Sequence, residues 1–168
     1  MHWQNKTKQL LLATALTVSA YATAQAQQVI FAAGYADFSD NASEDQALFS
    51  LEYHHKPFHQ ATRFSVGWGT ALSLHENGDF HIGLGVVGLY ALNERWFVEG
   101  SVMPGYFNPS IDLNDLGGDF QIRSLLGLGY ALDNGNSVSF AITHKSNAST
   151  NDDNPGVNAV LLRYHLGF

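Results

Sequence analysis

The sequence predicts an all-β protein, an eight-stranded antiparallel transmembrane β-barrel. Three observations support this class. Eight segments alternate with a two-residue period, and polar, turn-rich stretches separate them. Most of these segments are long for soluble strands but suit tilted strands that cross a bilayer. Their faces divide into one that is bulky and apolar and one that is mostly small, so the bulky side is expected to face lipid.

Residues 1–26 are predicted to be a cleaved secretory signal, which leaves 27–168 as the barrel. Two lysines precede an apolar run over residues 10–20, and Ala24-Gln25-Ala26 has the small-x-small form of a signal peptidase site. The run is too short for a spanning helix. An exported chain of this kind is either soluble outside the cytoplasm or a β-barrel of the bacterial outer membrane.

The composition excludes some functions. The formal charge is −7, and removing Lys6 and Lys8 with the signal makes it −9, which argues against nucleic acid as a partner. The chain has no cysteine, so no disulfide supports its fold. Many glycines and aromatic residues with few charges favour an all-β protein over a helical one.

The first half of the mature chain supplies four predicted strands. Val29–Phe38 carries aromatic residues near its end, and Ala47–His55 places Glu52 in the phase opposite to its bulky residues. Arg63–Leu74 sets Phe, Val, Trp and Leu side chains against serine and glycine. Phe80–Leu92 likewise sets aliphatic and aromatic residues against histidine and glycine. Each alternation predicts a strand with two unlike faces.

The second half supplies four more strands. Trp96–Phe107 begins and ends with aromatic residues, as expected at the two bilayer interfaces. Phe120–Leu132 sets large apolar residues against Gln, Arg and Gly, and Ser137–Ser146 alternates in the same way. Val157–Phe168 alternates up to a terminal phenylalanine, which resembles the C-terminal signal of outer-membrane barrels.

Charged residues in the small-residue phase indicate the content of the barrel. They are Glu52, Arg63, Glu99, Arg123 and Arg163. An eight-stranded barrel is narrow enough to be filled by side chains, and charges inside it must pair. The alternative is a secreted β-sandwich or lipocalin-like barrel, in which the bulky faces would form the core.

Connection lengths predict the orientation. If the N-terminus is periplasmic, the periplasmic side holds the connections 55–62, 93–95 and 133–136. The extracellular side holds the connections 39–46, 75–79, 108–119 and 147–156. Two of the outer connections are the longest in the chain, as in known outer-membrane barrels.

The seventh strand carries the candidate chemistry. His144 and Ser146 share its bulky face, at the end predicted to be extracellular. Residues i and i+2 of a strand lie about 7 Å apart, and side-chain rotation can bring the imidazole close enough to take the serine proton. From the residue types alone, His144 and Ser146 are either a catalytic pair or ordinary polar residues at the end of the barrel.

The sequence around this pair resembles a known family. The run His144-Lys145-Ser146-Asn147-Ala148, followed by Asn154-Pro155-Gly156-Val157-Asn158, is similar to the lipid A 3-O-deacylase (PagL) family. The resemblance implies an eight-stranded serine esterase of the outer membrane, with its active site facing the outer leaflet. It would hydrolyse the 3-O-linked acyl chain of lipid A in lipopolysaccharide and release a 3-hydroxy fatty acid.

The resemblance also implies catalytic roles. Ser146 would be the nucleophile and His144 the general base. Asn158 stands where the family has a glutamate that orients the histidine. An asparagine can orient a histidine but cannot offset the charge of the imidazolium. Asp152 and Asp153 are therefore kept as alternative orienting groups.

Two further sets of residues surround the predicted pair. Asn147, Ala148 and Asn154 are candidates for the oxyanion hole, although Asn154 serves equally well as a turn residue. Four apolar residues, which either form a substrate groove or simply contact lipid, are Phe140, Ile142, Val160 and Leu162.

A Ser-His mechanism needs no cofactor, and the histidines show no metal-binding spacing, so no cofactor and no metal are expected. The expected partners are lipopolysaccharide and the membrane, and the sequence leaves a homodimer open. Two other functions compete with the esterase. One is a non-catalytic structural or adhesive barrel, and the other is a phospholipase or acyltransferase barrel.

Overall fold

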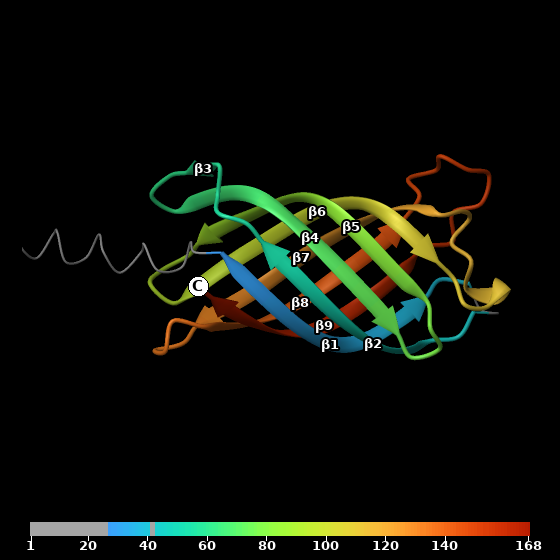
Figure 1. Ribbon diagram of the computed structural model, residues 1–168, viewed down its shortest axis with the longest axis horizontal. Helices are drawn as coiled ribbons and strands as arrows, with labels where there is room; N and C mark the ends of the chain where they lie inside the picture. The colour runs from blue at the N-terminus through green and yellow to red at the C-terminus, as the bar shows by residue number, and fades with distance from the viewer. Residues whose placement is uncertain (1–26, 41–42) are drawn as a thin grey trace, which may run out of the picture.

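The computed structural model describes residues 27–40 and 43–168, so the predicted signal lies outside the described residues. The chain forms an all-β closed barrel of eight long antiparallel strands, and the predicted fold class is confirmed (Figure 1). The elements are β1 (Gln28–Phe38), β2 (Gln46–His54), β3 (His59–Gln60), β4 (Phe64–His75), β5 (Phe80–Ala91), β6 (Trp96–Asn108), the 3₁₀ turn η2 (Asp112–Asn114), β7 (Phe120–Ala131), β8 (Ser137–Ser146) and β9 (Val157–Gly167). The long strands begin and end within one residue of the predicted positions.

Each long strand pairs with its neighbour in the chain, and the first and last close the barrel. β1 pairs with β9 from Gln28 opposite Gly167 to Phe38 opposite Val157, and β2 pairs with β4. Closure satisfies the backbone groups of both sheet edges, as a strand in hydrocarbon requires. The two-residue β3, which the sequence analysis missed, pairs with β4 through His59 and Val66. Two residues are too few to show a period.

The two faces of the wall are as different as the sequence predicts. Outward-facing Phe49, Leu84 and Leu162 are each more than 60% exposed, whereas inward-facing Glu52 and Arg123 are 1% exposed. Arg63 is the exception, because it precedes β4 and is exposed outside the barrel. The prediction that Arg63 faces inward was therefore wrong, since a residue just outside a strand is not bound by its alternation.

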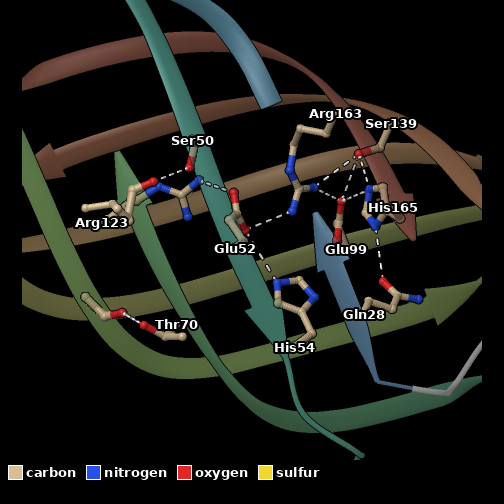
Figure 2. A network of polar contacts seen from close by, with 12 residues as sticks. Gln28, Ser50, Glu52, His54, Thr70, Glu99, Arg123, Ser139, Arg163 and His165 are labelled. Atoms are coloured by element: carbon tan, nitrogen blue, oxygen red, sulfur yellow. Dashed lines mark hydrogen bonds and ion pairs between the residues drawn. The ribbon is translucent and has the colours of Figure 1, made fainter. Parts of the chain in front are cut away.

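Polar side chains from several strands form a network in the lumen. The Glu52 carboxylate accepts hydrogen bonds from the guanidinium groups of Arg123 (2.7 Å) and Arg163 (2.9 Å). Arg163 also pairs with Glu99, whose carboxylate accepts from the Ser139 hydroxyl at 3.1 Å. Figure 2 shows Glu52 between the two arginines, with Arg163 reaching on to Glu99. The opposite charges offset one another where water cannot do so.

The two ends of the barrel differ. We call the end with connections 55–63, 92–95 and 132–136 the turn end, and the end with connections 39–45, 76–79, 109–119 and 147–156 the loop end. The C-terminus lies at the turn end, and the two longest connections, 109–119 and 147–156, lie at the opposite end (Figure 1). Among residues 27–40 and 43–168, no helix has the length and apolar character needed to cross a membrane.

A buried carboxylate organises the loop end. Asp79, which is fully buried, accepts hydrogen bonds from Gln46 and Asn114 (2.8 Å each) and from the backbone and hydroxyl of Ser110 (2.6 and 2.7 Å). Burial alone would raise the pKa of this carboxyl, but the donors outweigh burial and hold the pKa below its usual value. Asp79 therefore ties the connections 76–79 and 109–119 together as an ion.

Candidate active site

The phase of β8 is fixed from the inside by Lys145. Its side chain is 3% exposed and points into the lumen, where the ammonium donates to Nε2 of His75 at 2.9 Å. Because side chains alternate along a strand, His144 and Ser146 must then point outward. The lysine between the two candidate catalytic residues thus anchors both of them on the lipid-facing side.

His144 is held by the neighbouring strand. The register places it opposite Asn158 of β9, and its Nδ1 lies 2.9 Å from Oδ1 of Asn158. The asparagine oxygen can only accept, so in the neutral ring this contact places the hydrogen on Nδ1 and leaves the lone pair on Nε2. The contact thus orients the imidazole, and Nε2 has no hydrogen-bond partner among residues 27–40 and 43–168.

Gly156 lies directly against the imidazole. It has a φ of +73°, and a Cβ built there would lie 3.1 Å from Cε1 of His144 and 3.2 Å from the carbonyl oxygen of Lys145. Both the positive φ and this close approach favour glycine. The sequence left the Asn154-Pro155-Gly156 run open between a turn and a part of the site, and it gave no sign of this contact.

Ser146 ends β8 on the same face as His144 and is half-buried. Within residues 27–40 and 43–168 its hydroxyl makes no hydrogen bond, to His144 or to any other group. The serine is therefore free to rotate toward Nε2. Such hydrogen bonds are commonly long or absent without substrate and tighten in the reacting complex.

The oxyanion candidates fall into two kinds. The Asn147 amide is buried and donates to the carbonyls of Gly117 (3.1 Å) and Asp153 (2.6 Å), so it joins the loops 109–119 and 147–156. The amide oxygen of Asn154 accepts from the backbone N–H of Asn147 at 3.0 Å, which fixes the Asn154 side chain. In the described part of the chain, the Asn154 NH₂ group and the backbone N–H of Ala148 have no acceptor.

The backbone just after Ser146 adopts an uncommon conformation. Ala148 and Ser149 have φ values of 53° and 59°, in the left-handed region that residues other than glycine rarely adopt. The N–H of Ser149 donates to the side-chain oxygen of Asn147 at 2.9 Å, which supports this turn. Successive backbone N–H groups in such turns form concave sites that attract anions.

A groove of 570 Å³ lies beside His144 on the outer wall. It crosses β1, β9, β8 and β7, and apolar atoms dominate its surface. Of the four predicted groove residues, Ile142 and Val160 line it, whereas Phe140 and Leu162 lie outside its lining on the exposed wall. His144 and Asn158 also line the groove, so the oriented imidazole opens onto this apolar space.

The groove includes residues that the sequence analysis missed. Tyr35 and Asp37 come from β1 and Ser124 comes from β7. No local motif marks them, because only the register of four strands brings them beside His144. Asp152 and Asp153, the alternative orienting groups, are exposed and make no side-chain hydrogen bond to His144.

The described ranges contain no group of three or more His, Asp or Glu side chains placed to hold a metal ion. The polar groups that the structure gathers at this site are the His144 imidazole, the Ser146 hydroxyl and nearby amide donors. These features define the class of protein, a small β-barrel of the outer membrane with a polar site in its lipid-facing wall.

The comparisons with solved structures agree with that class. A crystal structure of the outer membrane enzyme PagL superposes with a TM-score of 0.68 at 20% identity, covering 84% of this chain and 99% of that one. Neisserial surface protein A (NspA) gives a TM-score of 0.57 at 10% identity, with 84% and 97% covered. A designed transmembrane β-barrel gives 0.52 at 8% identity, with 84% and 96% covered. At these identities the likeness shows the fold alone.

The family follows from the sequence. The profile of the lipid A 3-O-deacylase (PagL) family matches residues 2–167, nearly the whole chain. The chain belongs to this family. No curated protein sequence matches it.

Proposed function

We propose that this protein is a serine esterase that removes the 3-O-linked acyl chain of lipid A and releases a 3-hydroxy fatty acid. The observation that carries the proposal is the 2.9 Å contact between Nδ1 of His144 and Oδ1 of Asn158, beside an apolar groove and two residues from Ser146. Membership of the deacylase family supports the same substrate.

The mechanism begins with a proton transfer on the outer wall. Nε2 of His144 takes the proton of the Ser146 hydroxyl while Oγ attacks the ester carbonyl carbon. The N–H of Ala148 and the NH₂ of Asn154 are the free donors for the resulting oxyanion. The intermediate then collapses, and the imidazolium returns the proton to the departing 3-hydroxyl of lipid A.

Water completes the cycle. His144 takes a proton from a water molecule, whose oxygen attacks the acyl-Ser146 ester. The second intermediate releases the 3-hydroxy fatty acid and restores the serine hydroxyl. Asn158 holds the imidazole in the tautomer that both half-reactions need.

The lipid-facing location explains how the substrate arrives. An acyl chain can enter the groove from the bilayer and lie against Ile142 and Val160, with Phe140 and Leu162 extending the apolar wall. With the loop end outside the cell, the groove meets the outer leaflet, where lipopolysaccharide is found. The substrate never needs to leave the membrane.

Mass spectrometry of lipid A tests the proposal. The chain is expressed in a host whose lipid A keeps its 3-O-acyl chains, and we expect loss of one such chain with release of free 3-hydroxy fatty acid. Ser146→Ala should leave lipid A unmodified. Ser149→Ala is the matched control, because that exposed side chain makes no hydrogen bond in the described structure and should leave activity unchanged.

The alternatives give different products. Transfer of the acyl chain to a second lipid would identify an acyltransferase, and deacylated phospholipid with intact lipid A would identify a phospholipase. Intact lipids throughout, with a folded barrel in the membrane, would favour a structural or adhesive role. Full activity of Ser146→Ala would refute the nucleophile assignment.

A further inference from the structure

A row of polar residues crosses the outer wall at the level of His144. The register pairs Asp37 of β1 with Asn158 of β9, Asn158 with His144 of β8, and His144 with Ser124 of β7. All four line the groove. Directly opposed side chains on neighbouring strands have Cβ atoms about 4.5–5.5 Å apart, so each member of the row can reach the next.

Asn158 is the central member, and half of its amide is unused. Its oxygen accepts from Nδ1 of His144, while its NH₂ group has no acceptor in the described part of the chain. On the side of Asn158 away from His144 lies Asp37, whose exposed carboxylate makes no hydrogen bond there. A carboxylate accepting from the NH₂ group would polarise the amide and strengthen its oxygen as an acceptor.

We propose that Asp37 acts through Asn158 to supply the negative charge that offsets the imidazolium of His144 during the reaction. This inference rests on the proposed function. It explains how a chain with a neutral residue in the orienting position can still stabilise the charged histidine. Asp37 is a positioning residue, since it acts through the asparagine and does not touch the substrate.

The surroundings favour Asp37 over the other charged groups. Tyr35 is the other titratable residue of the groove beside Asp37 and His144. Lys145 faces the lumen on the far side of the wall, and the Asp45 carboxylate is engaged by the backbone N–H of Phe38 at 2.9 Å. The exposed loop acids Asp152 and Asp153 have no fixed register to His144, whereas Asp37 is placed by the β1–β9 pairing.

The experiment is a double-mutant cycle between positions 37 and 158, measured as fatty acid release from lipopolysaccharide by the full barrel in micelles. Asp37→Asn should lower kcat/KM about tenfold, because the imidazolium loses a nearby opposite charge. For the same reason the acid limb of the pH–rate profile should move to lower pH. In an Asn158→Glu background a carboxylate contacts His144 directly, so adding Asp37→Asn should change kcat/KM by less than about twofold.

Glu76→Gln is the matched control. It removes one exposed negative charge at the loop end, in the connection between β4 and β5, on the opposite side of the barrel from β8 and β9. It should move neither the rate nor the acid limb. Heat-modifiable migration on gels checks that every variant is a folded barrel.

Several outcomes would overturn the inference. One is a wild-type rate and a wild-type acid limb in Asp37→Asn. Another is a loss of kcat/KM on Asp37→Asn that is equal with Asn158 and with Asn158→Glu. The third is a shift of the acid limb in Glu76→Gln as large as that in Asp37→Asn. The pH at which the His144 ring titrates, followed by NMR in the wild type and in Asp37→Asn, tests the charge effect without any turnover. If wild-type protein releases no fatty acid, the proposed function fails. An unchanged His144 titration in Asp37→Asn overturns this inference alone.

Discussion

The lumenal network around Glu52 and the outer row around His144 both combine acidic and basic side chains but differ in burial and in charge pairing. In the lumen, the Glu52 carboxylate is held by two arginines and lies 3.4 Å from Nε2 of His54. On the outer wall, His144 has one partner, and the Ser146 hydroxyl has none in the described residues. The two clusters lie on opposite faces of the barrel wall, and β7 and β9 contribute residues to both.

The difference separates structural polar groups from chemical ones. A buried charge must be paired for the barrel to be stable, so the lumenal carboxylates are held by arginines, although Nη1 of Arg123 and Nε of Arg163 have no hydrogen-bond partner in the described structure. Polar groups facing hydrocarbon are costly and are rarely kept without a function. The exposed polar atoms of the outer row are therefore the ones that a substrate in the membrane can reach.

The largest expected effect comes from removing the base. His144→Ala should lower kcat by about 10³-fold, within the range for general acid–base groups. The free energy of unfolding should change by no more than about 0.5 kcal/mol. Fatty acid release and urea unfolding measure the two quantities. His59→Ala, an exposed histidine at the turn end, is the control. A large loss of stability in His144→Ala would show that His144 has a structural role like that of the lumenal residues.

Breaking the lumenal network should lower the stability of the barrel and leave the catalytic rate unchanged. Glu52→Gln leaves Arg123 and Arg163 without their shared carboxylate, and breaking such a buried pair costs about 3–5 kcal/mol of unfolding free energy. The rate of fatty acid release per folded molecule should equal that of the wild type. Urea titration followed by gel mobility measures the change, with exposed Glu94→Gln as control. An unchanged unfolding midpoint would mean that the network is not structural.

A smaller structural effect is expected at the loop end. Asp79→Asn should cost about 1–3 kcal/mol, because the donors from Ser110, Asn114 and Gln46 lose an ionised acceptor. The pKa of Asp79 is lower in the folded state than its ordinary 3.8. Its stabilisation is therefore present above about pH 4 and is lost as the pH falls through the folded pKa.

Unfolding of wild type and Asp79→Asn at several pH values tests this dependence. The difference between them should shrink steadily below about pH 4. A difference that is constant down to strong acid would show that the carboxylate contributes through its shape and not through its charge.

The smallest expected effect concerns the orienting residue. Asn158→Glu should preserve activity or raise it by up to about tenfold, because a carboxylate both orients the imidazole and offsets its charge. Initial rates of fatty acid release measure this change. A tenfold or greater loss would argue that Asn158 does not orient His144, even though the two side chains are in contact.

Much of the architecture could be predicted because it is a local property. The two-residue alternation located the eight long strands within one residue, and it placed Glu52, Glu99, Arg123 and Arg163 inside. The same alternation put His144 and Ser146 on one face. It failed for Arg63, which lies just beyond a strand, and for β3, which is too short.

The rest depended on how the strands meet. Alternation says which way a side chain points but not which residue of another strand lies beside it, since that is fixed by turns and barrel closure. Three features depend on that register. They are the ion pairs of Glu52 with two arginines, the position of the Asn147 amide between two loops, and the position of Asp37 beside Asn158. The sequence by itself determined the barrel and the shared outward face of His144 and Ser146. The tertiary structure decided the surroundings of that pair, because residues more than a hundred positions apart become neighbours only when β1 closes onto β9.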